Sequence, residues 1–163
     1  MVRVGQAGVA AERLGFQSSF LVEHHFTGWN QVSATLTLLT WLAARTERMT
    51  QSHLVLCDGF RHPVMLARQA VSLDHMSGGR FELALGWGSV VDEFHTFGIA
   101  PTAPAERVDR MRETLDVIKA CWSGEQFDYH GTWFDGSSIE GFTRIAELYK
   151  APSDLFRLFR YRA

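Results

Sequence analysis

Apolar positions along the chain alternate between helical spacing and short continuous runs, and this alternation sets the expected elements. In Pro63–Met76 the apolar residues lie three and four positions apart, which is typical of a helix, and proline suits a first turn because its missing N–H is not needed there. Gly78 and Gly79 then end the helix, since glycine adopts positive φ without a Cβ clash. The following run, Arg80–Leu85, is apolar on both faces, which indicates a parallel strand covered by helices.

The rest of the chain repeats this order of elements. A first helix ends at Gly15, and the expected strands are Ser19–Glu23 and Ser52–Cys57, with the helix Val32–Thr46 between them. A second amphipathic helix is expected at Ala105–Trp122. Its expected buried stripe is Val108, Met111, Leu115, Ile118 and Trp122, and its charged residues, including Arg107 and Arg110, are expected mostly in solvent. Two short aromatic runs in Phe127–Phe134 predict a hairpin.

Alternation of helix and strand predicts an α/β fold with a parallel sheet, either doubly wound or part of a (β/α)8 barrel. A full barrel typically has about 250 residues, whereas this chain of 163 residues has about three of the strands. The pattern alone leaves both architectures open. Gly136–Ser138 breaks the pattern, so we expect one domain over residues 1–136 and a divergent tail over residues 137–163, which ends in the basic and aromatic run LFRLFRYRA.

Composition narrows the possible partners. With 46% hydrophobic residues, 21% charged residues and a net charge of −2, the chain has no basic excess that would favour nucleic acid or an anionic membrane. The longest apolar stretch, Leu36–Ala44, is too short to span a bilayer. Two cysteines without a signal peptide predict reduced thiols and a cytoplasmic location.

Two polar or glycine-rich clusters follow predicted strands, at the strand ends where α/β proteins bind ligands. The first cluster is Glu23-His24-His25, in which alternation sends the two histidines to opposite sides. The second is Gly86–Ser89, where glycine lets backbone amides approach a cofactor closely. The other histidines lie on separate elements without ligand spacing, so we expect no metal site.

Several motifs resemble those of the bacterial luciferase-like flavin-dependent monooxygenases. They are EHHFT at residues 23–27, His62-Pro63, LDHMSGGRF at residues 73–81, Glu93-Phe94 with Phe97-Gly98, and Tyr129-His130-Gly131. The likeness covers roughly residues 5 to 135. It implies a partial (β/α)8 TIM barrel with about strands 2–4 and their helices. It also implies a cofactor at the carboxyl ends of the strands, namely reduced FMN or a deazaflavin.

The resemblance also implies roles for individual residues. It makes His24 a catalytic acid–base residue near the flavin, and an imidazole that titrates near neutrality suits that role. The other interpretation of His24 is a buried histidine bonded to backbone, which is the one we expect for His25. Relatives contact flavin through the loop that corresponds to Gly86, Trp87, Gly88 and Ser89. An arginine often reaches the phosphate from this loop in relatives, but this chain has Trp87 there.

In relatives the third strand runs past the flavin ring near the position of Leu54 and Val55. The backbone there sometimes contains a non-proline cis peptide. Leu54 is therefore a candidate cofactor contact, although we expect both residues mainly to fill the barrel core. The loop after the fourth strand is expected to be packed by Glu93, Phe94 and Phe97. Asp74-His75 is expected to cap the end of its helix.

Two functions remain open at this point. The first is a flavin-dependent oxidoreductase or monooxygenase that acts on a small organic substrate, using oxygen, with flavin supplied by a reductase and with association into a homo- or hetero-oligomer, commonly a dimer. The second is a truncated paralogue or gene fragment without catalysis that serves at most as an interaction subunit. The absence of a strand before the first helix and the divergent tail favour the second.

Overall fold

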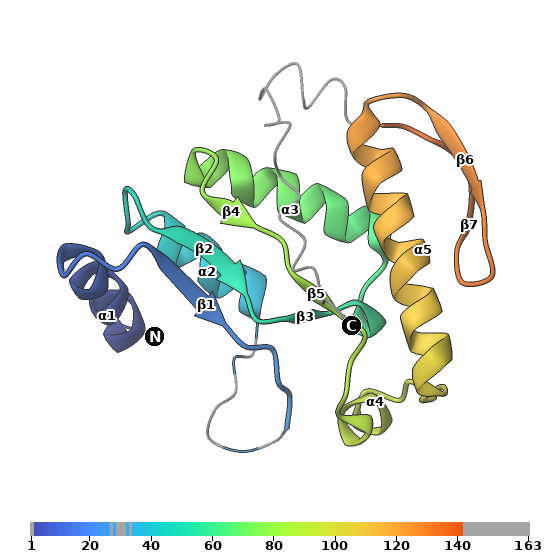
Figure 1. The fold of residues 1–163 in the computed structure, drawn as a ribbon, viewed down its shortest axis with the longest axis horizontal. Coiled ribbons are helices and arrows are strands. Elements are labelled where there is room, and N and C mark those ends of the chain that lie inside the picture. Colours follow the sequence, from blue (N-terminus) through green and yellow to red (C-terminus); the bar gives the residue numbers. More distant parts are fainter. Residues whose placement is uncertain (1, 27, 29–31, 33, 142–163) are drawn as a thin grey trace. The chain divides into compact units, whose positions relative to one another are not determined.

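The structure is a computed structural model that describes residues 2–26, 28, 32 and 34–141. It forms two compact units (Figure 1). Of the described residues, the first unit contains those up to Leu56 together with Ala70–Ala84. The second contains Cys57–Gln69 and the residues from Leu85 onward. Most of the predicted tail, including LFRLFRYRA, lies outside the described residues.

A three-stranded parallel sheet forms the centre of the first unit. Its strands are β1 (Ser18–Leu21), β2 (Thr50–His53) and β4 (Phe81–Glu82), in the order β1-β2-β4. Both neighbouring pairs are parallel, as the alternation of helix and strand predicts. The helices of this unit are α1 (Val2–Arg13), α2 (Thr35–Ala43) and the second half of α3 (Pro63–Ser77). The core of this unit includes Leu39 and Leu42 of α2, Ala70, Val71 and Leu73 of α3, Phe81 of β4, and Met49 just before β2.

The second unit is built around one long helix, α5 (Pro104–Ser123). The carboxylate of Glu106 accepts a 2.9 Å hydrogen bond from the Ala103 N–H, which closes the first turn of this helix. The antiparallel hairpin of β6 (Phe127–His130) and β7 (Asp135–Ile139) follows it. The remaining elements are the short turn η1 (Asp58–Phe60), α4 (Val91–Thr96) and the pair of β3 (Leu56–Cys57) with β5 (Leu85–Gly86).

Several predicted boundaries are wrong. The predicted strand Ser52–Cys57 is two strands, β2 and β3, separated at Leu54 and Val55. The predicted strand Arg80–Leu85 is likewise divided into β4 and β5. Alternation of apolar side chains does not reveal such breaks, because extended residues on either side of an interruption keep the same two-residue period.

Helix and hairpin boundaries also differ from the prediction. α2 begins at Thr35 and ends at Ala43, so it is shorter than the expected helix Val32–Thr46. The second hairpin strand starts at Asp135, just beyond the expected end at Phe134, and it crosses the predicted domain boundary after residue 136. The division into one domain over residues 1–136 and a tail over residues 137–163 stays a prediction. Positive φ at Gly78 and Gly79 confirms the sharp end expected for α3.

The buried stripe of α5 is rotated relative to the prediction. Arg107, Thr114, Val117, Ile118 and Cys121 are the buried residues of this helix, and only Ile118 was expected among them. Val108, Met111, Leu115 and Trp122 are partly exposed. The prediction failed because it sorted residues by polarity. An arginine and a threonine can face inward wherever neighbouring backbone and carboxylate groups accept their hydrogen bonds.

The arginine of the motif LDHMSGGRF has a structural role in the first unit. Arg80 donates hydrogen bonds to the carbonyl oxygens of Met49 (2.9 Å) and Ala43 (3.0 Å), and to the Thr46 hydroxyl (3.2 Å). It thereby binds the end of α2 to the start of β2. The Asp74 carboxylate accepts a 3.3 Å hydrogen bond from the Phe81 N–H, so the end of α3 is fixed to β4. Burial raises the pKa of Asp74, and the hydrogen bond from the Phe81 backbone opposes that rise.

Candidate functional site

The parallel pairing of β1 and β2 brings two of the candidate residues to one edge of the sheet. Leu21 is paired with His53, and the Leu54 N–H donates a 3.0 Å hydrogen bond to the Leu21 carbonyl oxygen. Both strands therefore end at the same edge. His24 follows β1 by three residues and Leu54 follows β2 directly, so both belong to the segments that leave the carboxyl edge of this sheet.

The second histidine after β1, His25, lies next to a buried carboxylate. Glu23 is buried, and its Oε1 atom lies 3.4 Å from Nε2 of His25. His25 itself is half-buried and its contact is with a carboxylate, so the expected burial and backbone bond are not seen, and a structural role for it stays a prediction. His24 is half-buried as well, and its role as an acid–base residue stays a prediction.

The peptide bond between Leu54 and Val55 is cis, and neither residue is proline. A cis bond at this position occurs in some relatives of the family that the motifs resemble. The two side chains are 53% and 38% exposed, so the expectation that they fill a core is wrong for this chain. They present apolar surface next to the polar segment that carries His24, as a site for a flat, largely apolar ring system requires.

The glycine-rich loop Gly86–Ser89 belongs to the second unit, where it packs closely on the end of β3. Gly88 has φ of +75°, and a Cβ atom on it would lie 2.7 Å from Cys57 Sγ and 2.7 Å from the Phe94 ring. A larger residue would be strained in backbone and would also collide with both neighbours. Glu93 and Phe94 are buried and pack this loop, as expected, whereas Phe97 is 43% exposed and contacts Phe60 at 5.0 Å between ring centroids.

Arg107 of α5 holds this loop. Its Nη1 atom donates a 2.6 Å hydrogen bond to the Gly88 carbonyl oxygen, and its guanidinium lies 4.8 Å from the centroid of the Trp87 ring and 5.8 Å from that of Phe94. The residue is only 7% exposed. A positive charge therefore lies directly behind the loop, although the loop itself has tryptophan where relatives often have arginine.

A second arginine of α5 faces the loop that follows β3. Asp58, the first residue after that strand, is 1% exposed. Its Oδ2 atom accepts a 3.4 Å hydrogen bond from the Thr114 hydroxyl and lies 4.0 Å from Arg110 Nε, while its Oδ1 atom has no hydrogen-bond partner. Burial raises the pKa of Asp58 to about 6, and the charge of Arg110 and the hydrogen bond from Thr114 oppose the rise.

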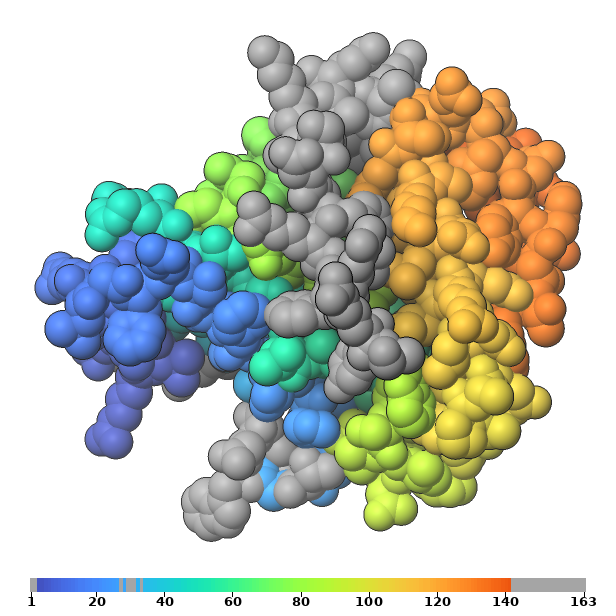
Figure 2. Space-filling model, in the orientation of Figure 1, coloured from blue at the N-terminus to red at the C-terminus, as the bar shows by residue number. Residues whose placement is uncertain are grey.

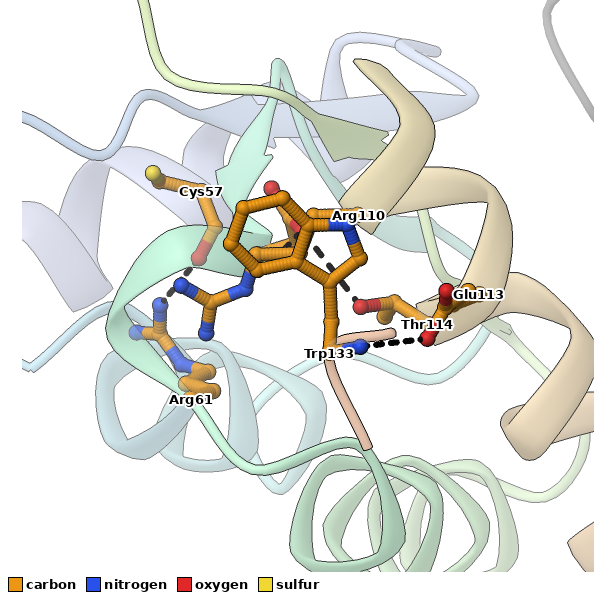
Figure 3. A network of polar contacts seen from close by, with 7 residues as sticks. Cys57, Arg61, Arg110, Glu113, Thr114 and Trp133 are labelled. Carbon is orange, nitrogen blue, oxygen red and sulfur yellow. Dashed lines mark hydrogen bonds and ion pairs between the residues drawn. The ribbon is translucent and has the colours of Figure 1, made fainter. Parts of the chain in front are cut away.

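The turn of the β6–β7 hairpin lies on the same helix. The Glu113 carboxylate accepts hydrogen bonds from the N–H groups of Thr132 (2.8 Å) and Trp133 (2.9 Å), and its Oε2 atom fills the space that a Cβ on Gly131 would occupy. In the space-filling view the orange hairpin lies directly against α5 (Figure 2). Figure 3 shows Arg110, Glu113 and Thr114 close together with Trp133. One helix thus holds three loops of the second unit.

The predicted site residues fall into two groups. His24 and Leu54 belong to the first unit, and Gly86, Trp87, Gly88 and Ser89 belong to the second. That the two groups bind one cofactor stays a prediction.

The sequence analysis missed Asp58 as a buried acid and Arg107 as a residue that holds a loop. The burial of Arg107 could have been predicted from the seven-residue spacing of Arg107, Thr114 and Cys121, because this spacing places all three on one face of the helix.

Within the described ranges, no three His, Cys, Asp or Glu residues are grouped so that they can hold a metal ion. Among the helices that the structure describes, none has the length and apolar character needed to cross a membrane.

Parallel strands that alternate with helices define an α/β protein. A family model described as luciferase-like monooxygenase matches residues 3–147. The chain belongs to this family. The resemblance to this family seen in the sequence is confirmed.

Two curated relatives have enzymatic names. The chain is 36% identical over 115 residues to 4-hydroxyprotoasukamycin monooxygenase of Streptomyces nodosus subsp. asukaensis, an alignment covering 71% of this chain and 30% of that protein. It is 37% identical over 132 residues to F420-dependent glucose-6-phosphate dehydrogenase of Microbacterium testaceum, covering 78% and 39%. The chain thus spans between about a third and two fifths of the length of these relatives.

A solved structure has a similar fold. The oxygenating constituent of 3,6-diketocamphane monooxygenase from Pseudomonas putida, a type II Baeyer-Villiger monooxygenase in complex with FMN, matches with a TM-score of 0.76 at 24% identity. The match covers 83% of this chain and 38% of that one. At this identity the likeness shows the fold alone.

Proposed function

We propose that the chain is part of a flavin- or deazaflavin-dependent oxidoreductase, with His24 as its acid–base residue. The observation that carries this proposal is the pairing of Leu21 with His53 in parallel register. Because of this pairing, the segments that contain His24 and Leu54 both leave the sheet at the same edge. The chain is also a member of the luciferase-like family. We further propose that the three parallel strands are strands 2–4 of a (β/α)8 barrel, in which such an edge binds the ligand.

The residues present fit a flavin in two respects. Leu54 and Val55 offer exposed apolar surface, and half-buried His24 lies on the neighbouring segment. Gly86–Ser89 offers backbone N–H groups, with Arg107 behind them as a source of positive charge for a phosphate or a ring edge. When bound, the cofactor supplies the redox chemistry. The chain's own residues bind it, orient it and, at His24, hold or release a proton.

The proposal includes both reduced FMN and the deazaflavin F420 as cofactors. The motifs resemble those of enzymes that use reduced FMN and oxygen, whereas one relative is named as F420-dependent. We propose that a reductase supplies the flavin if FMN is used, that the substrate is a small organic molecule, that the chain acts as a dimer or other oligomer, and that it works in the cytoplasm.

Titration of the protein with reduced FMN and, separately, with reduced F420 under anaerobic conditions tests the proposal. We expect one of them to bind. The His24→Ala variant should bind it with nearly the same affinity but lose turnover, because a proton-transfer group stabilises the transition state more than the bound ground state. His25→Ala is the matched control. Its structural contact with Glu23 predicts a change in stability and no selective loss of turnover.

Absence of binding by either cofactor would contradict the proposal and favour a non-catalytic interaction subunit. Turnover that survives in His24→Ala would remove His24 from the mechanism. If the chain requires a second polypeptide for activity, the binding measurement should be repeated on that complex.

A further inference from the structure

We propose that Asp58 is a proton-binding site that, through Arg110 and Glu113, controls how firmly the turn of the β6–β7 hairpin is held on α5. The inference goes beyond the proposed function and does not depend on a bound cofactor. All the groups involved belong to the second unit.

The carboxylate of Asp58 is placed where it must influence Arg110. It is almost completely buried, and its Oδ2 atom lies 4.0 Å from Arg110 Nε. At this distance the pair forms no hydrogen bond, and Arg110 Nε is buried without a hydrogen-bond partner. An ion pair of this kind is held by charge alone, so it ends when the carboxylate takes up a proton.

Arg110 in turn touches the hairpin. Its guanidinium lies 5.7 Å from the centroid of the Phe134 ring, in the turn that follows β6. The side chain of Arg110 therefore lies between a buried carboxylate and the hairpin. Loss of the negative charge on Asp58 leaves Arg110 free to turn toward another acceptor.

The next carboxylate on the same helix is Glu113, three residues further along α5. Residues at this spacing lie side by side on a helix and attract each other when their charges are opposite. Glu113 is already the acceptor for the N–H groups of Thr132 and Trp133 (Figure 3). When Arg110 loses Asp58, it competes with these two N–H groups for the Glu113 carboxylate, and the turn is held less firmly.

The pH at which this exchange occurs lies near the physiological range. Burial raises the pKa of Asp58 to about 6, so its proton is bound and released between roughly pH 5 and 7. The ionised carboxylate, and with it the firmly held turn, is the form present above that range. The uncharged form is present below it.

Other charged groups face the same turn. Arg61 donates a 3.0 Å hydrogen bond to the Cys57 carbonyl oxygen and keeps its charge throughout. The His62 ring lies 6.0 Å from the Phe134 ring between centroids, and His130 Nδ1 lies 2.8 Å from Asp135 Oδ1. His130 and Asp135 are exposed and flank the turn as the last residue of β6 and the first of β7.

Hydrogen exchange at the amides of Thr132 and Trp133, expressed as protection factors at pH 5.0 and 7.5, tests the proposal. In the unmodified protein we expect protection at pH 5.0 to be about tenfold lower, as for the loss of one hydrogen bond to a charged group. Asp58→Asn, which mimics the uncharged form, should show the low protection at both pH values. The control Asp116→Asn changes an exposed carboxylate of α5 and should behave like the unmodified protein.

Protection that does not change with pH in the unmodified protein would overturn the proposal, as would an unaltered pH dependence in Asp58→Asn. Loss of the transition in His62→Gln would assign it to that histidine instead. If Asp58→Asn does not fold, Thr114→Val provides the decisive measurement. It removes a hydrogen bond that lowers the pKa of Asp58, so the midpoint should move to higher pH, and an unmoved midpoint would contradict the role of Asp58.

Discussion

Arg107 and Gly88, nineteen residues apart, are joined by a 2.6 Å hydrogen bond from the guanidinium to the carbonyl oxygen. The same guanidinium lies over the Trp87 ring. A helix residue thus fixes the backbone of the loop that we propose to bind the cofactor. This contact yields a direct prediction.

Replacement of Arg107 by methionine, which keeps an unbranched apolar stem but removes the charge, should weaken binding of the reduced cofactor. The loss of one hydrogen bond from a charged donor corresponds to about 1.5–3 kcal/mol, or a dissociation constant roughly ten- to a hundredfold higher. Anaerobic titration with the reduced cofactor measures this dissociation constant. Arg112→Met is the control, since Arg112 is exposed and pairs with exposed Asp109 on the same helix. Equal affinities in the two variants would contradict the role of Arg107.

The buried carboxyl of Asp58 should make stability depend on pH in an unusual direction. Because its pKa is raised from 3.8 to about 6, the folded state binds this proton more tightly than the unfolded chain does. Its contribution to stability is therefore fully present below about pH 4 and is lost as pH rises toward 6. The loss amounts to about 3 kcal/mol for a shift of roughly two pKa units.

Urea unfolding of the unmodified protein and of Asp58→Asn, compared at pH 4.5 and 7.5, measures this effect. The difference in unfolding free energy between the two proteins should change by about 2 kcal/mol, because roughly a third of that loss has already occurred at pH 4.5. A difference that is the same at both pH values would show that the carboxyl of Asp58 does not titrate in this range.

The Glu12 carboxylate should give stability a pH dependence opposite to that from Asp58. It accepts hydrogen bonds from three successive N–H groups, those of Glu47, Arg48 and Met49, at 2.7 to 3.1 Å. The bond from the Arg48 N–H is the main cause that lowers the pKa of Glu12. Stability from this group is present above the unfolded pKa near 4.5 and is lost as pH falls through the lowered folded value.

Replacement of Glu12 by glutamine should cost about 1 kcal/mol at pH 7, a modest figure because the contact is open to solvent. The cost should disappear toward pH 3. Glu47→Gln changes a neighbouring glutamate whose backbone, and not its side chain, takes part in this contact, so it should be close to neutral. Urea unfolding of both variants is the measurement, and equal stabilities would rule out the contact as a source of stability.

Arg80 should not tolerate lysine. Its fork of donors reaches two carbonyl oxygens and a hydroxyl at once, and a single ammonium group cannot reproduce that geometry. We expect Arg80→Lys to lower the unfolding free energy by about 2 kcal/mol, from two hydrogen bonds of roughly 1 kcal/mol each. Arg48→Lys, at an exposed position, is the control and should change stability by less than about 0.5 kcal/mol.

The sequence predicted the elements of this fold well because each has a local cause. Helical spacing and paired glycines placed α3 and its end, and alternation of strands with helices predicted the parallel sheet. The breaks within two strands were not predictable, since the cis bond between Leu54 and Val55 leaves no trace in side-chain periodicity.

The candidate site was less predictable than the fold. His24 and the glycine-rich loop were found because strand ends and glycines are visible in a sequence. Arg107 and Asp58 were missed because their burial depends on partners distant along the chain, the Gly88 carbonyl oxygen in one case and Arg110 in the other. A charged residue is assigned to solvent by default, and only its tertiary partners reverse that assignment.

Because residues of α5 hold three loops, amino-acid substitutions in those loops should not act independently. Arg107, Arg110 and Glu113 follow one another at three-residue intervals, and each holds a different loop. Substitutions in these loops should therefore show epistasis even where the loops do not touch, because each alters the position of the same helix. Libraries that vary one loop at a time would miss compatible combinations, whereas libraries that vary a loop together with its residue on α5 should recover them.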